Sequence, residues 1–306
     1  MTQPPHPSNP KRGAALAALV VAMIVWGSTF VVTKVAMQEF PPWTLAFLRF
    51  AIASLVLLAF IRGRGGLKKL RRSVSLWRLT FLALTGIALF NAAFNYALVY
   101  GSASQGALLY ATIPAVLAVC AVLFLKERLN RGRVLGIALS VVGAALIVAS
   151  GEPRLEVAPS PLLGAALMLW TVVLWAAYTV AAKAVTDADQ IAVIFAISVL
   201  GALMLLPASA VELAIVGLTP TSAYGWLGVL YLGLFASAGC YALYNFAVRE
   251  LDVSTVGAFT NIDPIVGVVT AFLFLGEALS PAQAGGAAVV LAGMWLASME
   301  PRRSAR

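Results

Sequence analysis

Few side chains in this sequence could do chemistry inside a membrane, and two of them carry a charge. Asp263 lies near the middle of one long apolar run, and Arg49 lies inside another. An ionisable group at the centre of a bilayer costs at least about 2.5 kcal/mol and normally faces a cavity or a partner. Asp263 is therefore a candidate for binding a substrate ammonium or a proton, or a structural group paired with another segment. Arg49 is the candidate partner in such an ion pair, or a cation whose head group reaches toward the interface.

Aromatic and amide side chains could line a substrate cavity beside Asp263, because ligand pockets are mostly apolar with a few polar groups. Many aromatic residues in membrane proteins only pack or sit at the interfaces, so about half of the set is expected to do only that. With Asp263, the candidate substrate-binding residues are Trp26, Asn91, Tyr110, Trp175, Tyr178, Tyr241, Tyr244 and Asn261.

The residues that catalysis or metal binding needs are scarce. His6 is the single histidine and lies in a Pro-rich segment near the N-terminus. Cys120 and Cys240 lie inside apolar runs, which favours small core residues over a disulfide or a metal site. No G-x-x-x-x-G-K motif occurs, which argues against ATP-driven transport. The sequence therefore predicts no catalytic residue, no metal and no cofactor.

The elements that must position these side chains are membrane helices. Apolar residues make up 61% of the chain and charged residues 11%, against roughly 45–50% and about 25% in soluble domains. Continuous apolar runs of roughly 20 residues are typical of helices that cross a bilayer. We therefore predict an all-α polytopic membrane protein with ten transmembrane helices, at about 14–36, 43–61, 77–99, 104–125, 134–150, 162–182, 191–211, 224–248, 253–275 and 283–299.

An internal repeat divides the chain into two related halves. Residues 104–143 match residues 254–293 without a gap, at a spacing of 150. We predict a disordered cytoplasmic tail (1–12), a first five-helix repeat (13–150), a second five-helix repeat (151–299) and a short cytoplasmic tail (300–306). The matched positions include Pro114 with Pro264, Glu127 with Glu277, Gly136 with Gly286 and Gly143 with Gly293.

The charges between the runs predict that the second repeat is inverted. If the N-terminus is cytoplasmic, almost all of the 21 Lys and Arg residues fall in cytoplasmic segments, which also places the C-terminus inside. Five helices per half is an odd number, so the halves enter the membrane in opposite directions. The link around Glu127 holds four basic residues, whereas the link around Glu277 holds none. This topology accounts for the net charge of +9 without a nucleic-acid partner.

Several matched residues have expected structural roles. Pro114 and Pro264 each remove a backbone hydrogen bond in mid-helix, so they are candidate hinges at kinks. Lys34 lies near a helix end and is expected to extend its ammonium to the interface. Glu277 follows its helix directly, so we expect it to serve at a helix end or in an ion pair between the repeats.

Inverted repeats of this kind are typical of secondary transporters. The chain resembles the EamA-type ten-helix exporters of the drug/metabolite transporter superfamily in WGSTFVVTK (26–34), FLRFAIA (47–53) and the paired segments FLKERL and FLGEAL. The resemblance implies a multi-pass carrier of the inner membrane that moves amino acids or other small metabolites outward without ATP.

The main hypothesis is therefore a secondary transporter that exports small metabolites, amino acids first, by alternating access, with protons as a candidate coupling ion. One alternative is an exchanger of phosphorylated sugars or nucleotide sugars, but Lys34, Arg49 and Lys183 are few cations for a phosphate. A remote alternative is an intramembrane enzyme, which one buried Asp and no membrane His do not favour. The sequence leaves open the substrate, the coupling ion, the direction of net transport, the oligomeric state and which aromatics line the cavity.

Overall fold

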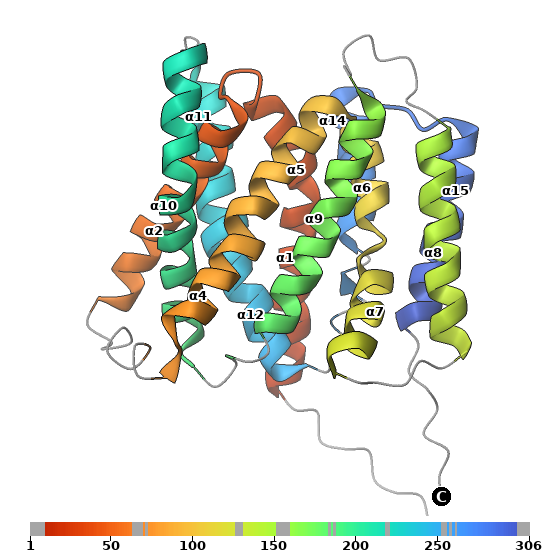
Figure 1. The fold of residues 1–306 in the computed structure, drawn as a ribbon, viewed down its shortest axis with the longest axis horizontal. Coiled ribbons are helices and arrows are strands. Elements are labelled where there is room, and N and C mark those ends of the chain that lie inside the picture. The colour runs from red at the N-terminus through yellow and green to blue at the C-terminus, as the bar shows by residue number, and fades with distance from the viewer. Residues whose placement is uncertain are drawn as a thin grey trace, which may run out of the picture.

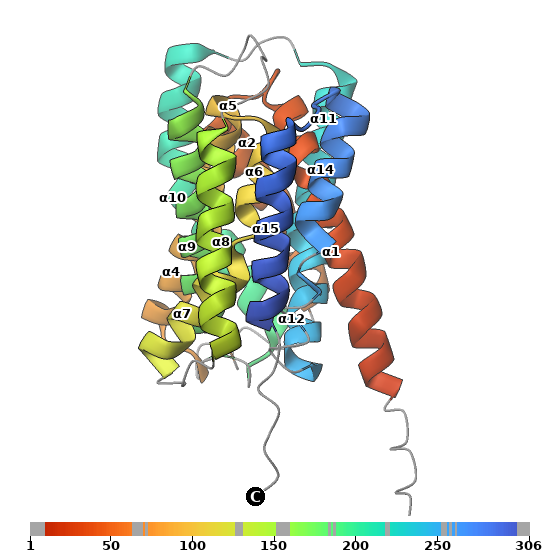
Figure 2. The ribbon, with the colours of Figure 1, turned by 90° about the vertical axis from the view of Figure 1, so that its right-hand side faces the viewer.

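The protein is a bundle of helices that run side by side along one direction (Figures 1 and 2). The computed structural model describes residues 10–62, 70, 73–125, 131–150, 160–182, 185, 188–217, 221–251, 256, 259–260 and 262–298, and within them every regular element is a helix. The elements are α1 (Pro10–Ala36), α2 (Pro42–Ile61), α4 (Leu76–Ala83), η1 (Leu84–Ala88), α5 (Leu89–Tyr100), α6 (Ala103–Tyr110), α7 (Ile113–Leu125), α8 (Arg131–Ala149), α9 (Pro161–Ala182), α10 (Gln190–Val216), α11 (Ala223–Tyr231), η3 (Leu232–Gly239), α12 (Cys240–Glu250), α14 (Ile262–Leu275) and α15 (Pro281–Ser298).

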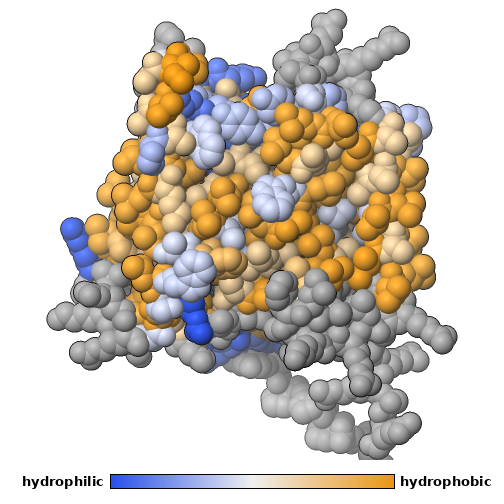
Figure 3. Space-filling model, in the orientation of Figure 1, coloured by the Kyte–Doolittle hydropathy of each residue, from blue (hydrophilic) through white to orange (hydrophobic). Residues whose placement is uncertain are grey.

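The lengths and surface of these helices indicate a multi-pass membrane protein. Six helical stretches in the described part of the chain are long and apolar enough to cross a bilayer, and four shorter apolar helices coincide with the other predicted runs. Large apolar side chains such as Leu55, Leu203 and Phe272 are well over half exposed. Figure 3 shows apolar residues covering most of the visible face between the two ends. In water such a surface would be unstable, whereas lipid tails match it.

The run predicted at 104–125 is not one kinked helix but two helices. α6 ends at Tyr110 and α7 begins at Ile113, so Pro114 lies in the first turn of α7. Pro264 likewise lies in the first turn of α14. A proline is tolerated there because the first N–H groups of a helix have no partner within the helix. The break at Ala111 and Thr112, just before Pro114, therefore replaces the predicted kink.

Two π-helical segments interrupt other predicted runs. η1 lies between α4 and α5, and η3 lies between α11 and α12. At the repeat spacing of 150, the residues that correspond to η1 fall within η3. A π-helical turn shifts each hydrogen bond by one residue and is frequent at functional sites. Nothing in the sequence pattern predicted these segments.

The glycines matched by the repeat meet where α8 crosses α15. A Cβ added at Gly143 would lie 2.8 Å from the backbone oxygen of Gly286, and one added at Gly293 would lie 2.7 Å from that of Gly136. The two helices therefore approach so closely that only hydrogen fits at these points. Small residues are the usual means of close packing in membranes, where apolar contact with lipid competes with apolar contact between helices.

Three glutamates tie one end of the bundle together, and each binds backbone N–H groups at the start of a helix. Glu277 accepts hydrogen bonds from Ala103 N (3.1 Å) and Ser104 N (2.8 Å) at the start of α6. Glu212 accepts hydrogen bonds from Thr44 N (2.8 Å) and Thr44 Oγ1 (3.0 Å) near the start of α2. A carboxylate at this place satisfies free N–H groups and complements the helix dipole.

The third glutamate of this set is Glu39, which accepts hydrogen bonds from Ser222 N and Ser222 Oγ, both at 2.6 Å, before α11. In all three cases the carboxylate and the helix belong to different halves of the sequence. Lys34 also binds at this end, because its Nζ donates to Gly101 O (2.8 Å) and pairs with Glu277 (3.4 Å). The expected ion pair of Glu277 between the repeats is confirmed, whereas Glu127 lies outside the described residues.

Substitution of one matched glycine tests the close crossing of α8 and α15. A Cβ in Gly293→Ala would lie 2.6 Å from Ser140 N, so the helices must move apart at a cost of about 1–3 kcal/mol. We expect a lower midpoint of thermal unfolding in detergent. Gly285→Ala is the matched control, because no atom lies within 4 Å of its added Cβ and alanine favours a helix over glycine. Equal midpoints for the two variants would contradict the close approach.

Candidate substrate site

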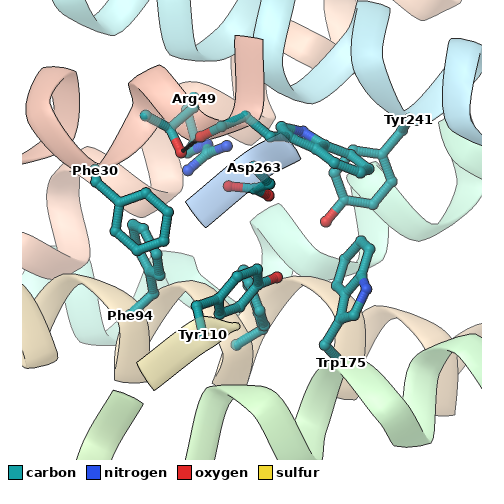
Figure 4. A pocket seen from close by; sticks show the side chains of 10 residues that line it. Phe30, Arg49, Phe94, Tyr110, Trp175, Tyr241 and Asp263 are labelled. Carbon is teal, nitrogen blue, oxygen red and sulfur yellow. Dashed lines mark hydrogen bonds between the residues drawn. The ribbon is translucent and has the colours of Figure 1, made fainter. Parts of the chain in front are cut away.

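A small cavity lies where helices from both halves of the sequence meet. Its volume is about 30 Å³, which is room for a water or two rather than for a metabolite. Figure 4 shows its lining side chains converging from opposite helices. The lining residues are Trp26, Thr29, Phe30, Arg49, Phe90, Phe94, Tyr110, Trp175, Tyr241 and Asp263.

A second cavity of about 20 Å³ adjoins the first. The two share four lining residues, Trp26, Tyr110, Trp175 and Asp263. Displacement of these shared side chains would merge the two spaces into a larger one. The second cavity also contacts Pro114 and Tyr244, and it reaches Thr260 just before α14. The breaks before α7 and α14 therefore border the space that would have to enlarge.

Arg49 and Asp263 both face the first cavity without forming the ion pair that the sequence suggested. Each residue is only 6% exposed, and no ion pair joins them although both are described. Arg49 Nε donates to Ser237 Oγ (2.9 Å), and the guanidinium lies over the ring of Phe50. Asp263 Oδ1 has no hydrogen-bond partner among the described residues. Two buried and opposite charges thus face one cavity while remaining apart.

Aromatic rings form two walls of the first cavity. The ring centroids of Trp26 and Trp175 are 5.4 Å apart in an edge-to-face arrangement, and Tyr241 packs on both. Phe30 and Phe94 lie 5.1 Å apart on the opposite wall. Edge-to-face contacts of this kind are favourable beyond the burial of area alone. The wall is therefore apolar and ordered, with the charged groups set into it.

The two π-helical segments supply hydrogen-bond partners for polar side chains that line the first cavity. Trp26 Nε1 donates to Ala236 O in η3 (2.8 Å), and Tyr241 Oη donates to Gly86 O in η1 (2.8 Å). Ser237, which holds Arg49, also belongs to η3. A π-helical turn frees carbonyl groups that an α-helix would use. Carbonyl groups of η1 and η3 therefore accept the hydrogen bonds that polar side chains of the cavity donate.

The structure brings most of the predicted site residues together. Trp26, Arg49, Tyr110, Trp175, Tyr241 and Asp263 line the first cavity, and Tyr244 and Pro114 line the second. Tyr178 lines neither cavity, because its ring packs against Trp175 (5.0 Å). Asn91 also lines neither, because its amide donates to Ile87 O in η1 (2.8 Å). Pro264 is buried in α14 and is not among the lining residues of either cavity, and Asn261 lies outside the described residues.

Sequence reasoning missed four lining residues of the first cavity: Thr29, Phe30, Phe90 and Phe94. A signal was available for two of them. Thr29 and Phe30 follow Trp26 by three and four positions, so they lie on the same helix face as a predicted site residue. Phe90 and Phe94 share a face with each other, but nothing marks them in a chain with 15 Phe residues.

Comparison with known proteins decides the class of the protein. The model of the EamA-like transporter family matches residues 13–149 and again residues 162–299. The chain belongs to the EamA-like transporter family. It is accordingly a transporter of small molecules and not an enzyme.

Relatives in this family resemble the EamA-like chain over nearly its full length. A protein of Streptantibioticus cattleyicolor named "Probable terminal-alkyne amino-acid exporter" is 30% identical, covering 94% of each chain. A protein of Salmonella typhimurium named "Probable amino-acid metabolite efflux pump" is 28% identical over 97% of this chain and 98% of its own. A solved crystal structure shares the fold with a TM-score of 0.65 at 20% identity, covering 93% of this chain and 96% of the other.

Replacement of Tyr241 tests the link between the cavity and η1. Tyr241→Phe keeps the ring but leaves Gly86 O without its donor, and an unsatisfied buried acceptor costs about 1–3 kcal/mol. We expect a lower unfolding midpoint in detergent. Tyr224→Phe serves as the control because Tyr224 is 83% exposed. The link would be refuted by two variants that are equally stable.

Proposed function

We propose that this EamA-like protein is a secondary transporter that exports amino acids across the inner membrane by alternating access. One observation carries the proposal: an aromatic cavity between the two halves of the chain exposes Asp263 and Arg49 without pairing them. Buried charges without a partner are unfavourable, so the cavity, once enlarged, suits a small ligand that supplies the missing partner. The names of two relatives, an amino-acid exporter and an amino-acid metabolite efflux pump, support the same substrate class.

The proposed architecture has ten transmembrane helices in two inverted repeats (13–150 and 151–299) with both termini in the cytoplasm. The family model supports it because it matches each half once. The start of α1 and the end of α15 lie at the same end of the bundle in Figure 1, as an even number of crossings requires. Bacterial relatives such as that of Salmonella typhimurium support the inner membrane as its location.

In this proposal the structure corresponds to a closed state, because the cavity has no room for a metabolite. Pro114 and Pro264 act as hinges at the starts of α7 and α14, where non-helical backbone borders the site. Broken helices at the centre of the membrane are a recurring element of transporter substrate sites. Opening at the end that holds Glu39, Glu212 and Glu277 requires their contacts with helix starts to break. Opening at the other end leaves these contacts in place.

Counterflow in liposomes tests the transport function. Purified protein is reconstituted, the liposomes are loaded with one unlabelled solute, and uptake of the same labelled solute is followed without ATP. The panel contains amino acids, purines and sugar phosphates. We expect labelled amino acids to accumulate transiently, and liposomes without protein to show none. Exchange restricted to phosphorylated compounds would favour the sugar-phosphate alternative, and a lack of flux for every solute would refute the proposal.

Proton coupling is tested separately at Asp263. A single carboxyl group that binds either a proton or a substrate ammonium would exchange one for the other, so transport should respond to a pH difference across the membrane. We expect Asp263→Asn to abolish this response. Glu250→Gln is the control, because this glutamate lies at the end of α12 beside exposed Arg249. A pH response that survives in Asp263→Asn would make Asp263 structural.

A further inference from the structure

We propose that Arg49 and Asp263 together recognise the zwitterionic head of an α-amino acid. In this assignment the guanidinium binds the α-carboxylate, the Asp263 carboxylate binds the α-ammonium, and the aromatic wall contacts an apolar side chain. The inference rests on the proposed transport of amino acids and adds a specific selectivity to it. Each half of the protein binds one of the two charges of the substrate.

Arg49 is prepared to bind a carboxylate. A guanidinium has five N–H donors in a planar fork that matches the two oxygens of a carboxylate. Only its Nε–H is used by the described protein, in the hydrogen bond to Ser237. The position of Arg49 is fixed by that bond and by the ring of Phe50, 5.3 Å from the guanidinium carbon. Its terminal N–H groups therefore remain as donors for a ligand in the cavity that Arg49 lines.

Asp263 is prepared to bind an ammonium. Its Oδ1 is buried and has no hydrogen-bond partner within the described residues, although buried polar atoms are almost always paired. Figure 4 shows the carboxyl group pointing into the space between Arg49, Tyr110 and Tyr241. Among the described residues, no lysine or histidine lines either cavity. A ligand ammonium would therefore supply the donor that the described residues do not provide.

The coexistence of both charges selects the ligand class. A simple amine would satisfy Asp263 but would meet the positive charge of Arg49, and a simple acid would satisfy Arg49 but would meet the negative charge of Asp263. An uncharged ligand would leave both groups buried and unpaired, which is costly. An α-amino acid carries an ammonium and a carboxylate group on the same carbon atom, so it alone among these satisfies both groups at once.

The remaining walls indicate the side chain of the substrate. Phe30, Phe90 and Phe94 line the first cavity beside Trp26 and Trp175. Aromatic walls favour apolar contact and offer no hydrogen bonds from the phenylalanine rings. We therefore assign an aliphatic or aromatic side chain to the substrate rather than an acidic or basic one.

Binding to the purified protein in detergent tests this assignment without leakage of uncharged forms through a bilayer. The probes are L-leucine, its methyl ester, isoamylamine and 4-methylpentanoate, which share one apolar group and differ in charge. Dissociation constants come from tryptophan fluorescence, since Trp26 and Trp175 line the cavity. We expect leucine to bind about 10- to 100-fold more tightly than each analogue, the usual effect of losing a charge-assisted hydrogen bond.

Variants assign each charge to its residue. Arg49→Gln should weaken leucine binding at least about tenfold while isoamylamine and the methyl ester bind no worse than before. Asp263→Asn should weaken leucine binding similarly while 4-methylpentanoate binds no worse. Arg249→Gln is the control for loss of a positive charge, because its side chain is 64% exposed, and it should bind all four probes as the wild type does.

Several outcomes would overturn the inference. If the wild-type protein binds isoamylamine or 4-methylpentanoate as tightly as it binds leucine, it does not recognise both charges of the substrate. This result decides the question even if a variant fails to fold. Equal loss of all probes in Arg49→Gln would make Arg49 structural. Absence of leucine binding in a protein that moves other amino acids by counterflow would refute the apolar site. Counterflow of sugar phosphates alone would instead refute the proposed function, so the two failures are distinguishable.

Discussion

A polar group inside a bilayer has no water to bind, so it must find its partner within the protein. This constraint explains where the bundle departs from regular α-helix. The π-helical segments free backbone carbonyls, and side chains of the cavity region take them: Trp26 donates to Ala236 O and Tyr241 donates to Gly86 O. Asp263 Oδ1 is a visible exception. Among the described residues, Thr33 Oγ1, Asn91 Oδ1, Asn95 Oδ1 and Ser140 Oγ are also buried without a partner, but none of these four residues is among those that line the two cavities. The unpaired atom that does face both cavities indicates where a ligand belongs.

The same constraint acts at the end of the bundle where α2, α6 and α11 begin. Their first N–H groups bind Glu212, Glu277 and Glu39, each from the other half of the sequence. A glutamate that binds a helix of its own half would stabilise that half alone, whereas these contacts resist separation of the halves at one end. The close glycine contacts of α8 with α15 add a second connection between the halves. The carboxylate contacts therefore oppose opening at one end of the bundle, whereas the glycine contacts hold α8 against α15 by close packing.

Much of the framework could be predicted from the sequence, because hydrophobic runs and a repeat are local patterns. The repeat singled out glycines on α8 and α15, and the structure places Gly143 close to Gly286 and Gly293 close to Gly136. Most of the site aromatics were also predictable, since a Trp or Tyr at mid-helix is conspicuous. The separation of Arg49 from Asp263 was not, because it depends on how α2 and α14 lie relative to each other. Phe90 and Phe94 were missed because an apolar residue carries no signal in a chain that is 61% apolar.

The charges of the site break the symmetry of the repeat. The residue matched to Asp263 is Ile113, and at the spacing of 149 that relates Trp26 to Trp175, the residue matched to Arg49 is Ser198. Each half of the chain thus supplies one charge that the other half lacks. A ligand that binds both charges spans the two halves, so its binding energy depends on how the halves are arranged. A ligand shifts a conformational equilibrium only through such a difference in affinity. A zwitterion therefore favours arrangements in which both charges face a cavity large enough to hold it, whereas a ligand held by one half alone would leave the equilibrium unchanged.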